Sequence, residues 1–119
     1  MYLNATNLNL QVVLSAAVTT NQLDCHVSYS TYNAKGTDSK PSIYRSATNS
    51  TSDVNILPAP TVQGTVFVVE RVSIYNKDTV AATVTVKTDD GTTERIITKQ
   101  TLNTTEGLFY DSYNGWYIL

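Results

Sequence analysis

The sequence predicts an all-β protein, an antiparallel β-sandwich of jelly-roll-like type with eight or nine short strands. Three observations predict it. Apolar and polar residues alternate over several segments, turn residues separate these segments, and Thr is abundant where the helix formers Glu and Lys are scarce. A chain of 119 residues is long enough to bury a core without a disulfide or a metal. We therefore expect one domain over residues 1–119.

The segment Val66–Tyr75 is the longest run rich in β-branched and aromatic residues, and it contains neither Gly nor Pro. These properties predict a long, central strand. Its even-numbered residues would face the core, but Glu70 is one of them, and a carboxylate is costly to bury. Either a β-bulge at Glu70-Arg71 shifts the register, or this pair lies where the strand leaves the core.

Two strands are predicted before this segment. Residues 1–7 read as a polar N-terminal arm, after which apolar residues alternate over Leu8–Leu14 and again over Leu23–Ser30. Residues 33–64 form the least regular, loop-rich part of the chain. Within it we expect short strands at Ser42–Ala47 and Asp53–Leu57, with a loop at Tyr32–Pro41.

The segments after Tyr75 predict two hairpins. Ala82–Val86 and Glu94–Thr101 alternate, and the turn Asp89-Asp90-Gly91-Thr92 joins them, with Gly91 free to adopt a positive φ. The last hairpin begins at Leu108. Its Asn114-Gly115 pair favours a two-residue type I′ turn.

Charge and composition exclude several classes of partner. The formal net charge is −2 and the pI is about 5.1, so we expect no nucleic-acid partner, because phosphate binding needs a basic patch. No apolar run approaches the ~20 residues of a membrane helix, so no membrane partner is expected. Met1-Tyr2-Leu3-Asn4 lacks a basic region, so no signal peptide is visible. Only 15% of residues are charged, which suits packing beside identical copies, although compositional drift explains it equally well.

No constellation predicts catalysis. Asp24-Cys25-His26 holds the one Cys and the one His, but neighbours on a strand point to opposite faces, so Cys25 and His26 cannot act together. Asp89, Asp90 and Glu94 offer carboxylates for a weak calcium site, yet Asp-Asp-Gly is ordinary turn chemistry. We expect no enzyme activity, no catalytic residue, no metal and no cofactor.

Aromatic residues are the candidates for contacts between chains. Tyr offers a large contact area at low entropy cost and is favoured at interfaces. The candidate interface residues are Tyr32, Tyr44, Tyr113 and Trp116. The alternative is that half of the Tyr residues belong to the core or rim of the sandwich.

Several segments together resemble small virion proteins of tailed bacteriophages. They are Leu10–Leu23, Val72–Thr79, Ala82–Val86, Asp90-Gly91, Thr98–Glu106, Leu108-Phe109-Tyr110 and Gly115-Trp116. The chain departs from the pattern at Thr104-Thr105, where such proteins carry a Pro-Gly turn. The resemblance implies a non-enzymatic virion structural protein of the capsid decoration (cement) or head and tail fitting type.

This resemblance implies a location on the capsid exterior and two kinds of partner. These are the major capsid protein and copies of the chain itself, as a trimer ahead of a dimer. The alternative is a tail or fibre module that contacts host surface glycans, and a small hydrolase has the least support. A glycan site needs an exposed aromatic ring beside convergent polar groups, whereas a cement protein needs a broad, self-complementary flank. The uncharged segments Leu8–Leu14 and Trp116–Leu119 would be poorly protected if either lay at a sheet edge.

Overall fold

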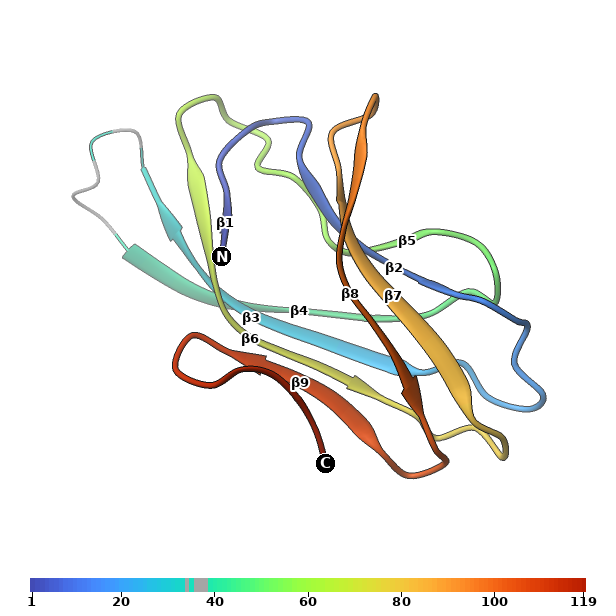
Figure 1. Ribbon diagram of the computed structural model, residues 1–119. Coiled ribbons are helices and arrows are strands. Elements are labelled where there is room, and N and C mark those ends of the chain that lie inside the picture. The colour runs from blue at the N-terminus through green and yellow to red at the C-terminus, as the bar shows by residue number, and fades with distance from the viewer. Residues whose placement is uncertain (34, 36–38) are drawn as a thin grey trace.

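The computed structural model describes residues 1–33, 35 and 39–119, and over these residues it is all-β, with two antiparallel sheets packed as a sandwich and no helix (Figure 1). The prediction of the fold class is confirmed, while jelly-roll connectivity stays a prediction. The strands are β1 (Tyr2–Leu3), β2 (Asn9–Leu14), β3 (Asp24–Tyr32), β4 (Ser39–Ala47), β5 (Val54–Leu57), β6 (Val66–Tyr75), β7 (Ala82–Asp89), β8 (Glu94–Leu102), β9 (Gly107–Asp111) and β10 (Gly115–Ile118). No helix among the described residues is long and apolar enough to cross a membrane.

One sheet has six strands and the other has four. The six-stranded sheet runs in the order β10-β9-β6-β3-β4, and β1 also pairs with β6; the four-stranded sheet runs β5-β2-β7-β8. The predicted central strand, β6, is indeed central, because it pairs with β1, β3 and β9.

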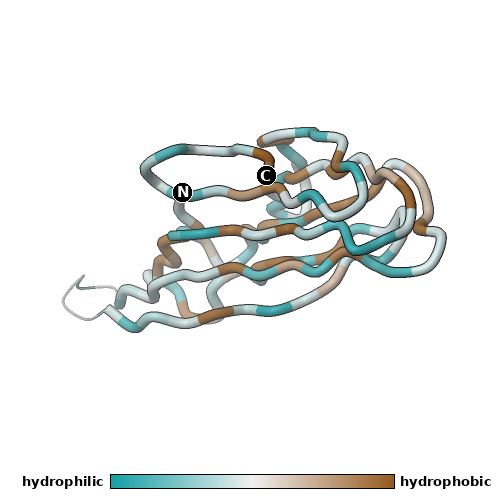
Figure 2. The backbone as a smooth tube through the Cα atoms, turned by 90° about the horizontal axis from the view of Figure 1, so that it is seen from below, coloured by the Kyte–Doolittle hydropathy of each residue, from teal (hydrophilic) through white to brown (hydrophobic). Residues whose placement is uncertain are grey.

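The core lies between the two sheets. Brown and teal segments alternate along the strands in Figure 2, as expected when one face of each strand is buried. The fully buried apolar side chains come from both layers: Leu3, Leu10, Val12, Leu14, Leu23, Cys25, Val27, Ile56, Leu57, Val69, Val72, Ile74, Val84, Val86, Leu102 and Leu108.

A β-bulge at Glu70 decides which face of β6 is buried. Ser28 pairs with Arg71 and the next residue of β3, Tyr29, pairs with Val69, so Glu70 is the extra residue. On the N-terminal side of the bulge the odd-numbered residues face the core, so Val69 is 1% exposed while Glu70 is exposed. On the C-terminal side the even-numbered Val72 and Ile74 are buried. Of the two explanations offered for Glu70, the bulge is correct. The expectation that Val66 and Val68 face the core is wrong, because the bulge moves them to the other face.

The expected polar arm at residues 1–7 is partly wrong. Tyr2 and Leu3 form β1, which pairs with Val68 and Phe67, and Leu3 is completely buried. The Val69 N–H donates to the Met1 carbonyl at 2.9 Å and extends this pairing. A strand of two residues shows no alternation, so the sequence pattern does not reveal it.

The loop-rich segment 33–64 contains both expected strands, but β4 is longer than predicted. It begins at Ser39 and includes Pro41, which pairs with Ser30. Pro41 fits there because β4 is an edge strand. Proline has no backbone N–H to donate, and this is tolerated where a strand has a neighbouring strand on one side only. β3 likewise continues to Tyr32, and the tip of the expected loop, at residues 34 and 36–38, lies outside the described residues.

The two hairpin predictions have different outcomes. Gly91 has a φ of 88°, as expected for the turn between β7 and β8. The predicted type I′ turn is wrong: Asp111 pairs with Gly115 across a three-residue loop, and Asn114 lacks the positive φ that a type I′ turn requires. The Asp111 carboxylate stabilises the longer loop, since it accepts the N–H groups of Tyr113 at 2.9 Å and Asn114 at 2.6 Å.

Candidate functional site

The outer face of the six-stranded sheet, on the side away from the core, carries two rows of side chains that cross five strands. The strand register defines both rows. The first row is Arg45, His26, Ser73, Phe109 and Tyr117. The second row is Ile43, Ser28, Arg71, Asp111 and Gly115. Side chains one strand apart in a row lie close enough to contact a common ligand.

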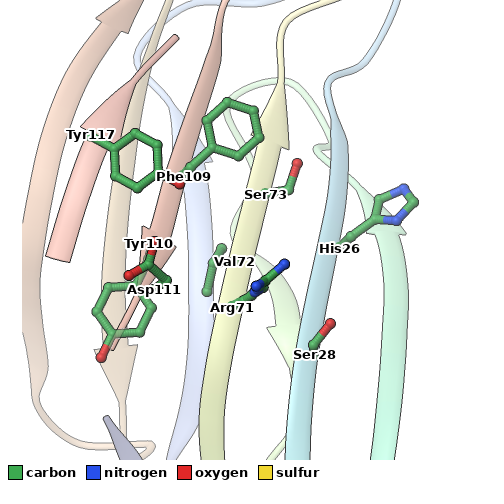
Figure 3. A pocket seen from close by; sticks show the side chains of 9 residues that line it. All are labelled: His26, Ser28, Arg71, Val72, Ser73, Phe109, Tyr110, Asp111 and Tyr117. Carbon is green, nitrogen blue, oxygen red and sulfur yellow. The ribbon is translucent and has the colours of Figure 1, made fainter. Parts of the chain in front are cut away.

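Residues of both rows line a partly open pocket of about 340 Å³ on the outer face of β3, β6, β9 and β10 (Figure 3). It is lined by His26, Ser28, Arg71, Val72, Ser73, Phe109, Tyr110, Asp111 and Tyr117. Figure 3 shows the Phe109 and Tyr117 rings side by side at one end, with Ser73, Arg71, Ser28 and His26 along the strands beside them.

Phe109 and Tyr117 form the aromatic part of the pocket. Their ring centroids are 5.8 Å apart, and the ring planes are inclined by 27°. The Phe109 ring lies over Gly107, since a Cβ atom at Gly107 would stand only 2.6 Å from ring atoms Cε2 and Cζ. Gly107 therefore leaves the space that lets the Phe109 ring lie along the sheet, and we call this pair of rings the aromatic platform.

The polar side chains beside the platform differ in whether they already form hydrogen bonds or ion pairs within the chain. Both carboxylate oxygens of Asp111 accept hydrogen bonds, Oδ1 from the Tyr113 and Asn114 backbone and Oδ2 from the Asn114 amide at 3.0 Å. The Asn114 side chain and backbone N–H lower the pKa of Asp111 below its ordinary value.

Arg71 is exposed and has no carboxylate partner, since the ion pairs among the described residues are made by Lys77 and Lys87. The side chains of His26, Ser28 and Ser73 likewise form no hydrogen bond with another described residue. The pocket thus presents unengaged donors next to a flat aromatic surface.

The four predicted interface residues do not come together. Tyr113 is at the tip of the β9–β10 loop and is 95% exposed, whereas Trp116 in β10 is half-buried with its ring 5.1 Å from that of Tyr110. Tyr44 lies in the edge strand β4 and is exposed. Tyr32 ends β3 and lines a second hollow together with Tyr2. Trp116 and Tyr113 share one hairpin, but Tyr32 and Tyr44 lie on the far side of β6 from it.

Cys25 and His26 face opposite sides of β3, as predicted. The Cys25 thiol is fully buried, and burial raises its pKa to about 12, so it is not a nucleophile at neutral pH. His26 is exposed on the outer face.

The carboxylates weighed as a calcium site are engaged elsewhere. Asp89 accepts the Gly91 N–H at 2.8 Å, Asp90 accepts the N–H groups of Thr92 and Thr93, and Glu94 pairs with Lys87 at 2.9 Å. In the described part of the chain no group of three or more His, Cys, Asp or Glu side chains is placed to hold a metal ion.

Sequence reasoning missed the aromatic platform and Arg71 as candidate functional residues. One local signal was present: Gly107-Leu108-Phe109 places a glycine and an aromatic residue two apart on one strand, hence on the same face. The approach of Arg71 to Phe109 depends on the pairing of β6 with β9, which is not a local pattern.

No protein-family model, curated protein or solved structure was found to match the chain.

Proposed function

We propose that the chain is a non-enzymatic structural protein of a tailed-bacteriophage virion, a capsid decoration protein that binds the outside of the assembled shell. Its partners would be the major capsid protein and further copies of itself. The compact all-β fold and the sequence resemblance given above support this proposal. The main observation behind it is that the edge strand β10 has no charged side chain and exposes apolar residues.

β10 is an edge strand, and Gly115–Leu119 has no charged side chain. Ile118 is 38% exposed and Leu119 is 75% exposed. A groove of about 230 Å³ runs beside them, lined by Gln100 of β8 and by Leu108, Trp116, Tyr117 and Ile118. An apolar edge strand with free backbone groups is a template for pairing with another chain.

The other edge strands have features that disfavour pairing with another chain, namely charged residues, prolines or a short length, and β10 lacks charge and proline. The edge strand β4 contains Lys40, Pro41 and Arg45, and the edge strand β8 contains Arg95 and Lys99. Two further edge strands are short: β1 has two residues, and β5 has four and is followed by Pro58 and Pro60. Of the two uncharged segments, Leu8–Leu14 does not lie at an edge, because β2 lies between β5 and β7, whereas Trp116–Leu119 does. The β10 flank is therefore the surface that a neighbouring chain would cover.

The proposal predicts a closed homo-oligomer, a trimer ahead of a dimer, whose affinity for assembled shells exceeds its affinity for free capsid subunits. We expect a trimer because capsid decoration proteins, which the chain resembles, commonly sit at threefold positions of the capsid. Binding that depends on two neighbouring capsid subunits at once gains from effective concentration, which unassembled subunits do not offer.

The test mixes purified protein with heads of the parent phage that lack it and, separately, with unassembled capsid subunits, and images the particles. Ile118→Lys places a charge on the β10 edge, and Ile43→Lys is its matched control, since Ile43 is 58% exposed on the opposite edge strand of the same sheet. We expect wild type and Ile43→Lys to decorate heads and Ile118→Lys to lose both oligomer and decoration. Failure of the wild type to bind heads would overturn the proposal.

The second candidate function is a tail or fibre module that contacts host surface glycans. The aromatic platform favours it, because its half-buried rings line a pocket beside polar side chains that have no partner among the described residues, and a glycan site requires an aromatic ring beside convergent polar groups. Binding of the protein to a tail component in the same imaging experiment, with bare heads left undecorated, would select this candidate.

A further inference from the structure

We propose that the pocket on the outer face of the six-stranded sheet is a binding site for an acidic saccharide, a glycan that contains a hexuronic acid. The aromatic platform would stack against the apolar face of one pyranose ring, and Arg71 would bind the carboxylate of that sugar or of its neighbour. This site does not depend on the proposed decoration function, because it lies on a sheet face and not on the β10 edge.

The shape of the platform supports a ring-shaped ligand. The Phe109 ring is held over Gly107 and supported by Tyr117 at 5.8 Å, so its position is fixed before any ligand arrives. An exposed aromatic face that is already ordered binds a flat, partly apolar partner with little loss of side-chain entropy. A pyranose has such a face, formed by its axial C–H groups.

The charge of the pocket supports an acidic ligand. Asp111 is the carboxylate among the lining residues, and its oxygens are occupied by the β9–β10 loop. Arg71, directly across the β6–β9 pairing from Asp111, makes no ion pair with any described residue. A planar guanidinium offers two parallel donors to a carboxylate, which gives both affinity and orientation.

The hydroxyl groups of a saccharide match the remaining donors and acceptors. Ser28 and Ser73 flank Arg71 and Phe109 in the two rows, and neither hydroxyl has a partner among the described residues. Each can donate one hydrogen bond and accept others. A simple anion would use Arg71 alone, whereas a saccharide would use Arg71, the serines and the platform together.

The experiment is a titration of ¹⁵N-labelled protein with a tetrasaccharide of galacturonic acid, a neutral tetrasaccharide of galactose, and citrate, followed by amide chemical shifts. We expect saturable shifts in β3, β6 and β9 around Ser28, Arg71 and Phe109, with the acidic tetrasaccharide at least tenfold tighter than the neutral one. Tighter binding of citrate than of the tetrasaccharide would overturn the proposal, because it would show a site for anions in general.

Three variants test the roles of the residues. Arg71→Gln should remove the preference for the acidic tetrasaccharide, and Phe109→Leu should weaken both tetrasaccharides at least tenfold while leaving the amide spectrum folded. Arg95→Gln is the matched control, because Arg95 is an exposed arginine on β8 of the other sheet. Absence of saturable binding, shifts confined to the other sheet, or equal effects of Arg71→Gln and Arg95→Gln would each overturn the proposal.

Discussion

The Asp78 carboxylate accepts the backbone N–H of Thr20 at 2.8 Å, although 58 positions separate the two residues. It also accepts the N–H groups of Thr19 at 2.8 Å and Asn21 at 3.0 Å, so one side chain orders the connector between β2 and β3. Asn76 in turn holds Asp78, whose N–H donates to the Asn76 side-chain oxygen at 2.9 Å. The Asn76-Lys77-Asp78-Thr79 segment, part of the resemblance to virion proteins, therefore has a structural role at this end of the sandwich.

These hydrogen bonds predict a stability that depends on pH. The N–H groups of Thr19, Asn21 and Thr20 lower the pKa of Asp78 from 3.8 to about 2. Because the folded-state pKa is depressed, the stabilisation is fully present above the unfolded pKa of 3.8 and is lost as the pH falls through about 2.

The measurement compares melting temperatures of wild type and Asp78→Asn between pH 7 and pH 2. We expect the variant to melt lower at pH 7 and the two curves to converge as the pH falls below about 4. Asp90 and Asp111, whose pKa values are also lowered, are present in both proteins and cancel in the comparison. A difference that stays constant down to pH 2 would contradict the assignment.

Thr105 has a φ of 67°, a left-handed conformation that is unfavourable for a β-branched residue. Replacing it with glycine removes the clash of its Cβ atom, although the greater flexibility of glycine in the unfolded chain offsets part of the gain. We expect Thr105→Gly to raise the free energy of unfolding by about 1 kcal/mol, measured by urea denaturation.

The adjacent residue provides the control. Thr104 does not have a positive φ, and its hydroxyl donates to the Asp78 carbonyl at 2.5 Å. Thr104→Gly should therefore lower the free energy of unfolding, by about 1–2 kcal/mol. If both glycine variants change stability in the same direction, backbone strain at Thr105 is not the cause.

Trp116 is half-buried against the core and tilts onto the Tyr110 ring at 5.1 Å. A fully buried Trp costs about 3–5 kcal/mol when truncated to Ala, so we expect about 2–3 kcal/mol for Trp116→Ala. Tyr113→Ala on the same hairpin should change the free energy of unfolding by less than about 0.5 kcal/mol, because Tyr113 is 95% exposed. Chemical denaturation of both variants checks the pair, and equal effects would show that Trp116 does not anchor the hairpin.

The sequence predicts the fold class because the alternation of apolar residues is local, and β3 shows this best. The alternation predicts Cys25 and Val27 of β3 and the preceding Leu23 on one face, and all three are fully buried. Local patterns fail where a neighbouring strand decides the outcome. Pro41 signals a turn in the sequence but is accepted in β4 because that strand is at an edge.

The candidate site was less predictable than the fold. The platform needs the register that places Phe109 beside Ser73 and Tyr117, and register is fixed by tertiary pairing. The Asn114-Gly115 turn shows the same limit: its dipeptide favours a two-residue loop, but the Asp111 carboxylate captures the Asn114 N–H and stabilises a loop of three residues.

The bulge at Glu70 gives the last prediction. Val69 and Val72 both face the core, which is possible at a spacing of three only because Glu70 is an extra residue in β6. Deletion of Glu70 would restore regular alternation of Val69, Arg71 and Val72 without moving any of them to the wrong face. We expect this deletion variant to fold with a loss of about 1–2 kcal/mol, which includes the hydrogen bond that the Ser30 hydroxyl donates to Glu70.

Deletion of Ser73 from the same strand is the control. It places Val72 and Ile74 next to each other in the chain, so one of these two buried residues must turn to the solvent face. Because a slip of one residue moves the whole remaining strand to the other face, this variant should show no cooperative unfolding transition. Thermal and urea denaturation followed by circular dichroism distinguish the two deletions. If both deletions unfold the protein, β6 cannot pair regularly with β3 once Glu70 is removed, and the fold requires the bulge.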